Sequence, residues 1–133
     1  MYSLAVSDHI MIAHSFRGEI FGPAQQVHGA TYGVEVEFRR ASLDAHGLVC
    51  DIGRALTVLR EVLAGFNYRN LDEVPELAGC NTTTEFMAGE IFARLRQRIA
   101  AGDLGPDTAG RLHSMRVLLR ESPVAWAAYE SPL

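Results

Sequence analysis

The sequence contains no hydrophobic run that approaches the roughly 20 apolar residues of a membrane-spanning helix. Residues 1–10 also lack the basic start and the apolar block of a secretion signal. Both absences argue against insertion into a membrane or transport across one. We therefore expect a cytoplasmic protein with no membrane partner.

An excess of positive charge is missing as well. The chain carries 12 basic and 16 acidic residues, so its formal net charge at pH 7 is -4. Phosphate backbones and anionic lipid surfaces attract proteins with the opposite balance. We therefore expect no nucleic-acid partner.

Cysteine is scarce, because Cys50 and Cys80 are the only two and neither belongs to a CxxC pair. Small secreted domains depend on a framework of several disulfides, which this sequence cannot form. We expect two free thiols, and Cys50 is more simply a core residue than a ligand contact.

Internal repeats and low-complexity tracts are absent too. A chain of 133 residues with 48% hydrophobic content is long enough to bury a core of its own. The sequence therefore predicts a single domain over residues 1–133.

Apolar residues recur at every second position in the first part of the chain. This alternation covers 2–14 and 27–40 and is typical of strands with one buried face. His14 and His28 share the parity of the apolar residues in their strands. Between the strands, 15–26 contains two glycines and a proline and shows no sustained period. It is predicted to be a loop long enough to fold over a site.

The period of the apolar residues then changes to three or four. This spacing predicts an amphipathic helix over 50–64. A second helix is predicted to begin at Thr82. Thr82 and Glu85 fit a capping box, in which each side chain satisfies a free backbone amide of the first turn.

Two further strands are predicted near the C-terminus, over 112–121 and 125–129, after a linker at 102–110. The element order is therefore ββααββ. This order predicts an α+β domain, in which an antiparallel four-stranded sheet carries two helices on one face. We expect oligomerisation to cover the other face.

Five short segments, in order along the chain, match the landmarks of one family. The family has a histidine that ends strand one, the motif HGHNY, a segment GMVxDF, a PTxE helix start and a C-terminal ET pair. The matching segments here are Met11-Ile12-Ala13-His14, His28-Gly29-Ala30-Thr31-Tyr32, Gly47-Leu48-Val49-Cys50-Asp51-Ile52, Thr82-Thr83-Thr84-Glu85 and Glu121-Ser122.

Over nearly its whole length the chain thus resembles the 6-pyruvoyltetrahydropterin synthase and 6-carboxytetrahydropterin synthase family. The resemblance implies the tunnelling fold (T-fold) of that family. It also implies a homo-oligomer, either a trimer-based hexamer or a tetramer, that binds a small pterin-like ligand at its subunit interfaces.

The resemblance further implies a zinc ion held by three histidines, one from strand one and two from HGH. The chain keeps His14 and His28, but Ala30 stands at the third position, and a methyl group cannot ligate a metal. Two interpretations stay open: an incomplete zinc site, or two histidines that only form hydrogen bonds in a partly buried pocket. Sequence alone supports none of the side chains that could be proposed as a third ligand, namely His9, Glu19 and His46.

The family's proton-transfer groups are a cysteine or a glutamate in the loop before HGH and an Asp-His pair in a segment LDHxxLN. Gln25 stands at the glutamate position, and Asn67 and Tyr68 stand at the positions of the Asp-His pair. None of the three is a base at neutral pH. The sequence therefore predicts no secure catalytic residue and argues against the standard synthase (lyase) reaction.

Glu121 matches the family's C-terminal glutamate, which accepts hydrogen bonds from the amino group and a ring nitrogen of the pterin. It shares the parity of apolar residues earlier in its strand, where a carboxylate needs donors. The alternative is an ion pair with Arg116 or Arg120. The resemblance implies that Thr83 and Glu85 help to shape the pocket, although a helix-capping role alone also explains them.

The leading hypothesis is a diverged member of this family that binds a pterin or a related heterocycle through Glu121. One alternative is an active pterin-side-chain lyase with an altered metal site. In that case a metal at His14 and His28 would polarise a side-chain oxygen while Tyr68 or water moves protons. The others are a non-catalytic binding protein and a purely structural homo-oligomer with a vestigial site.

Overall fold

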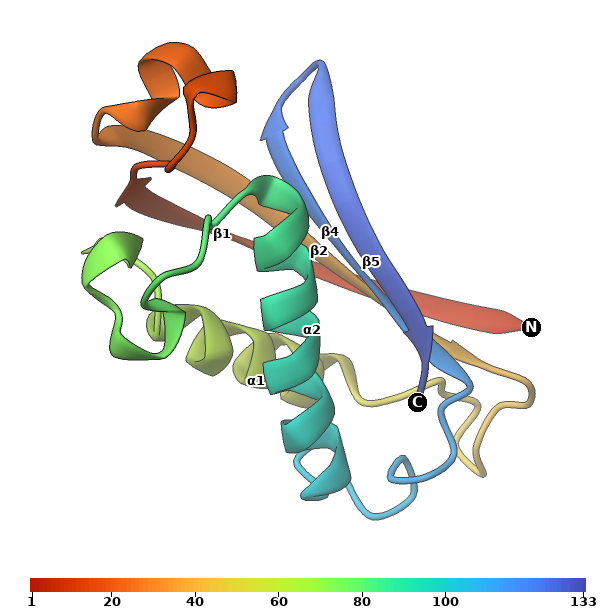
Figure 1. The fold of residues 1–133 in the computed structure, drawn as a ribbon. Helices are drawn as coiled ribbons and strands as arrows, with labels where there is room; N and C mark the ends of the chain where they lie inside the picture. The colour runs from red at the N-terminus through yellow and green to blue at the C-terminus, as the bar shows by residue number, and fades with distance from the viewer.

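A five-stranded sheet with the order β3-β1-β2-β4-β5 is the frame of the molecule, and two long helices pack on one of its faces (Figure 1). The computed structural model describes all residues from Met1 to Leu133. The strands are β1 (Tyr2–His14), β2 (His28–Arg40), β3 (Arg69–Asn70), β4 (Ser114–Ser122) and β5 (Ala125–Pro132). The helices are α1 (Ile52–Ala64) and α2 (Thr84–Ala100), with short 3-10 helices η1 (Glu19–Gln25), η2 (Leu71–Glu73) and η3 (Pro75–Leu77).

β1 and β2 form a long antiparallel hairpin of thirteen residue pairs, from Tyr2 opposite Arg40 to His14 opposite His28. The period-two pattern therefore predicted both strands correctly. β4 pairs with the other side of β2, and β5 pairs with β4, both antiparallel. The hairpin places the two histidines opposite each other at one end of the sheet.

The prediction of an antiparallel four-stranded sheet is wrong in one respect, because β3 adds a fifth strand that runs parallel to β1. Two residues are too few to show a period in the sequence. Asn67 and Tyr68, just before β3, attach this segment to the edge of β1. The Met11 N–H donates to Asn67 Oδ1 at 3.0 Å, and the Tyr68 N–H donates to the Met11 carbonyl oxygen at 2.7 Å.

The predicted loop between the first two strands contains the short helix η1, drawn in orange at the end of the hairpin in Figure 1. The helix is irregular, because Gly22 has a φ of 51° inside it. A backbone hydrogen bond from Phe16 N to Ala24 O, 3.1 Å long, closes the segment on itself. So short and broken a helix shows no apolar period in the sequence.

α1 confirms the predicted helix, with a start two residues later than expected. Asp51 is its N-cap and accepts a hydrogen bond from Arg54 N at 2.9 Å. A carboxylate at this position satisfies a free amide of the first turn and favours a helix start there. The buried stripe of α1 is Ala55, Val58, Leu59, Val62 and Leu63.

The predicted capping box at Thr82 and Glu85 is wrong by one residue. Thr83 is the N-cap of α2, and its side chain accepts a hydrogen bond from Phe86 N at 3.2 Å. Thr82 is instead buried, with its hydroxyl 3.1 Å from His14 Nδ1. Glu85 lies exposed in the first turn, where its negative charge interacts favourably with the positive end of the helix dipole. Thr82 is thus available to the histidine because its neighbour caps the helix.

One hydrophobic cluster of 29 buried residues fills the space between the helices and the sheet. It includes Cys50, so the expected core position of this thiol is confirmed, and burial raises its pKa to about 11. No helix covers the opposite face of the sheet (Figure 1). None of the helices has the length and apolar character needed to cross a membrane.

The cap of α2 gives a direct test of the corrected helix start. Replacement Thr83→Ala should lower the free energy of unfolding by about 1 kcal/mol, because the Phe86 amide loses its acceptor. Urea denaturation followed by circular dichroism measures this change. Thr83→Ser keeps the hydroxyl and should retain most of the stability. Equal stability of the alanine variant and the unchanged protein would contradict the assignment.

Candidate functional site

His14 and His28 form a contact pair at the shared end of β1 and β2. Their ring centroids lie 4.6 Å apart in an edge-to-face arrangement, and His14 is only 1% exposed. The ring of Phe16 packs against both, 4.6 Å from His14 and 5.5 Å from His28. This contact agrees with the parity that the two histidines share with the apolar residues of their strands.

Each imidazole of the pair is oriented through its Nδ1 atom. His28 Nδ1 donates to the carbonyl oxygen of Gln26 at 2.8 Å. His14 Nδ1 lies 3.1 Å from the Thr82 hydroxyl. Burial and the neighbouring His28 lower the pKa of His14 below the usual histidine value. Both effects favour the neutral form of His14.

The orientation of the two histidines suits metal ligands, but their number does not. Ligating histidines commonly have their second ring nitrogen held as it is here. Ala30 lies opposite Ile12, two pairs along the hairpin from the histidines, and contributes only a methyl group. Nowhere in the chain do three or more His, Cys, Asp or Glu side chains gather as they would around a metal ion. The residues present therefore do not fit a three-histidine zinc site, and His9, Glu19 and His46 do not complete it.

Glu121 lies at the C-terminal end of β4, where a bulge interrupts the pairing with β5 between Arg120 and Ser122. The Thr84 hydroxyl donates to Glu121 Oε2 at 3.2 Å. Thr84 begins α2, so Glu121 points to the helix-covered face, as the alternation predicted. Its carboxylate also raises the pKa of His14, although burial and His28 outweigh this effect.

The alternative of an ion pair for Glu121 is wrong. No ion pair joins its carboxylate to Arg116 or Arg120. The Arg120 guanidinium instead packs over the ring of Trp126, 4.5 Å from the centroid. Glu121 is exposed in the single chain and keeps most of its acceptor capacity.

Two residues beside Glu121 were not singled out by sequence reasoning. Thr84 follows the helix cap in a run of three threonines. Its place in this run was the only feature of the sequence that could have indicated a contact with Glu121. Tyr32 is 1% exposed and lies on β2, where burial raises its pKa and the carboxylates of Glu121 and Glu85 raise it further. The contribution of Thr83 and Glu85 to a pocket stays a prediction.

The residues at the family's proton-transfer positions have structural partners instead. Gln25 Nε2 donates to the Gly22 carbonyl oxygen at 3.1 Å, inside η1. Asn67 is bonded to the edge of β1, as described above. Tyr68 has a φ of 59° and is 79% exposed. It borders a hollow of about 410 Å³ beside β1, together with Met11 and other residues of β1, β2 and β3.

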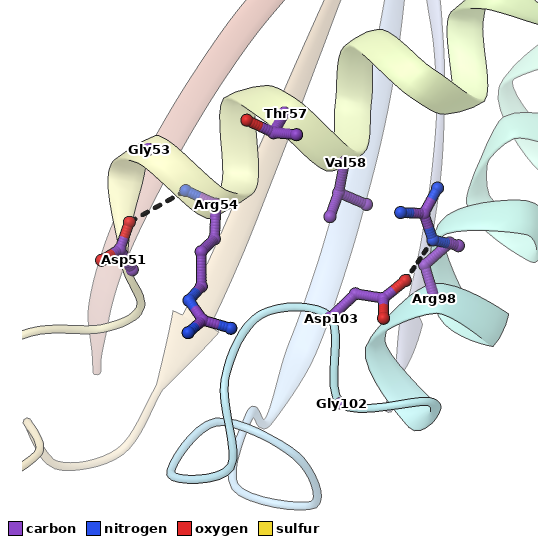
Figure 2. A pocket seen from close by; sticks show the side chains of 8 residues that line it. All are labelled: Asp51, Gly53, Arg54, Thr57, Val58, Arg98, Gly102 and Asp103. Atoms are coloured by element: carbon purple, nitrogen blue, oxygen red, sulfur yellow. Dashed lines mark hydrogen bonds and ion pairs between the residues drawn. The ribbon is translucent and has the colours of Figure 1, made fainter.

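A hollow of about 550 Å³ lies elsewhere, between the start of α1 and the end of α2 (Figure 2). Figure 2 shows Arg98 and Asp103 pointing toward each other, and Arg98 also bonds to Glu61 on α1. These ion pairs tie α2 to α1 and to the turn that follows α2. The hollow is thus bordered by structural ion pairs and does not include the histidines or Glu121.

Comparison with known proteins agrees with this architecture. The family model of 6-pyruvoyl tetrahydropterin synthase matches residues 3–132. The chain therefore belongs to the 6-pyruvoyl tetrahydropterin synthase family. No curated protein matches its sequence.

Solved structures of synthases share the fold at low sequence identity. The structure of the Caenorhabditis elegans 6-pyruvoyl tetrahydropterin synthase superposes with a TM-score of 0.81 at 22% identity, over 98% of this chain and 95% of that one. The structure of the Plasmodium vivax synthase superposes with a TM-score of 0.78 at 17% identity, over 99% of this chain and 98% of that one. The structure of the Plasmodium falciparum synthase superposes with a TM-score of 0.73 at 16% identity, over 98% of this chain and 99% of that one.

The missing third ligand can be tested by restoring it. Ala30→His adds an imidazole to the same face of β2 as His28, two residues along the strand. After dialysis against a chelator, this variant should retain close to one zinc per chain and the unchanged protein far less, as measured by elemental analysis. Adding His28→Ala to the variant should remove the gain. Near-stoichiometric zinc in the unchanged protein would contradict this interpretation of the site.

Proposed function

We propose that the protein is a diverged 6-pyruvoyl tetrahydropterin synthase-like protein that binds a pterin or a related bicyclic heterocycle, with Glu121 as the recognition carboxylate. The observation that supports this most is the environment of Glu121, which has one hydroxyl donor and no cationic partner. A 2-amino-4-oxo ring offers an amino group and a ring N–H side by side. Two such donors match the free acceptor positions of an ionised carboxylate.

The proposal places the ligand at the interface between copies of the chain. In the sheet order, β5 is one edge, and β1 lies free along most of its length, because β3 covers only two of its residues. Unpaired edges of long strands are normally covered by pairing with another chain or by closure into a barrel. A neighbouring copy would also cover Glu121, which is exposed in the single chain. A homo-oligomer, either a trimer-based hexamer or a tetramer, accounts for both features.

The proposal does not extend to the standard lyase reaction. A base must lie within hydrogen-bond reach of the proton that it abstracts. The amides of Gln25 and Asn67 are bonded to the protein's own backbone and accept no proton at neutral pH. The site thus supports recognition of a ring more than transformation of its side chain.

Loss of the carboxylate should weaken binding strongly. Glu121→Ala should reduce the affinity for pterin by about 1.5 to 3 kcal/mol, a roughly 10- to 150-fold rise in Kd, because charge-assisted hydrogen bonds are lost. Fluorescence titration of pterin and of guanine measures the change. Glu61→Ala, which removes a carboxylate that pairs with Arg98 at the far end of α2, is the matched control. Unchanged affinity in Glu121→Ala would reject the proposed function.

The synthase reaction can be tested separately from binding. Incubation with dihydroneopterin triphosphate, with and without added zinc, should yield no pyruvoyl product by chromatography. Ala30→His should not restore turnover, because the proton-transfer groups are still absent. Product formation by the unchanged protein would instead support the alternative of an active lyase with an altered metal site.

A further inference from the structure

Arg40 is a buried charge at the end of the β1–β2 hairpin that lies away from the histidines (Figure 1). The residue is only 6% exposed, although no carboxylate forms an ion pair with it. Its one hydrogen bond runs from Nη1 to the carbonyl oxygen of Val49, 3.2 Å away. A buried cation is unfavourable unless acceptors or an opposite charge surround it. Arg40 therefore has fewer partners than its burial calls for.

The other two nitrogens of this guanidinium group, Nε and Nη2, have no acceptor in the chain. No buried side-chain nitrogen in the molecule is both sealed from solvent and without a hydrogen bond. Nε and Nη2 of Arg40 therefore reach the surface, although the residue as a whole is buried. A guanidinium group carries five N–H donors, so most of its donor capacity is available to a bound group.

A hollow of about 290 Å³ with a mostly apolar wall lies beside Arg40. Three residues of this wall are its neighbours. Tyr2 is its partner in the β1–β2 ladder, and Val49 accepts its hydrogen bond. Burial raises the pKa of the Cys50 thiol to about 11, and the Arg40 charge opposes this rise, so the guanidinium lies within electrostatic reach of the sulfur. The free donors of Arg40 therefore adjoin the hollow.

Asp44 is the acidic side chain on which Arg40 acts, but its carboxylate is engaged in its own turn. Its Oδ1 accepts from the backbone amides of His46 and Leu48, at 2.8 and 2.9 Å. These two bonds lower the pKa of the Asp44 carboxyl, and the Arg40 charge adds to the effect. Because the carboxylate forms no ion pair with Arg40, the free donors of the guanidinium still lack an anion.

The rim of the hollow exposes apolar surface to water. Its exposed side chains come from the start of β1, the turn after β2 and the start of α1, and they are Tyr2, Leu43, Leu48 and Ile52. Apolar side chains that gather around one hollow mark a place where a ligand or partner can cover them. The hollow thus combines an apolar rim with a cation behind its wall.

We propose that this hollow binds a small amphipathic carboxylate, whose charged group pairs with the free N–H groups of Arg40 and whose apolar body covers the rim. The two oxygens of a carboxylate match the fork of a guanidinium group. A neutral apolar molecule would leave the buried charge without a partner, and a wholly polar anion would leave the rim in water. Glu121 lies toward the opposite end of the sheet, so this site does not depend on the proposed pterin binding.

The experiment titrates octanoate and octanol into the full-length protein at pH 7 by isothermal titration calorimetry. The two probes share an apolar chain, but only octanoate carries a charge. Arg40→Gln removes the cation, and Arg60→Gln makes the same change on the exposed side of α1 as the matched control. Ile52→Asp leaves Arg40 in place and puts a carboxylate at the rim, in the first turn of α1, where an acidic residue is tolerated. Thermal denaturation checks that each variant folds.

Octanoate should bind at one site per chain, about tenfold or more tightly than octanol, because charge-assisted hydrogen bonds hold its carboxylate. Arg40→Gln should remove this preference, Ile52→Asp should weaken octanoate binding by repulsion, and Arg60→Gln should change neither affinity. If Arg40→Gln does not fold, Ile52→Asp decides.

Three results would overturn the proposal. The first is the absence of octanoate binding, as when a second copy of the chain covers the hollow. The second is equal affinity for octanoate and octanol. The third is unchanged octanoate affinity in folded Arg40→Gln or Ile52→Asp.

Discussion

The continuous pairing of β1 with β2 is the interaction on which the candidate site depends. Its thirteen pairs place His14 opposite His28 and turn Tyr32 toward the helices. A slip of one residue would move each of these side chains to the opposite face. β4 continues the ladder on the other side of β2, so the same register also determines where Glu121 lies. One ladder of backbone hydrogen bonds thus places side chains from both ends of the chain in the candidate site.

The long elements could be predicted from the sequence because each has one buried face and enough residues to show a period. β3 could not, since its place depends on Asn67 bonding to Met11, a contact between residues 56 positions apart. The start of α2 was misplaced for a related reason. Three consecutive threonines can each cap a helix, and the contact of Thr82 with His14 leaves Thr83 to do so.

The site was predictable to the extent that strand alternation determines it. Alternation placed the two histidines and Glu121 on the helix-covered face, whereas Thr84 was missed because its contact forms only when α2 packs at the end of β4. The fold is common to the family, and function depends on the particular residues of the site. In the function proposed above, Glu121 recognises the ring, while Ala30, Gln25 and Asn67 stand where the resemblance implies groups of the family's reaction. The proposed binding and the family's reaction thus involve different residues.

A crystal structure of the protein with pterin bound tests the central claim most directly. We predict the amino group and the adjacent ring N–H within hydrogen-bond distance of the two Glu121 carboxylate oxygens, with Thr84 still bonded to Oε2. A pterin bound away from Glu121, or a Glu121 carboxylate paired with an arginine of a neighbouring copy, would contradict the account.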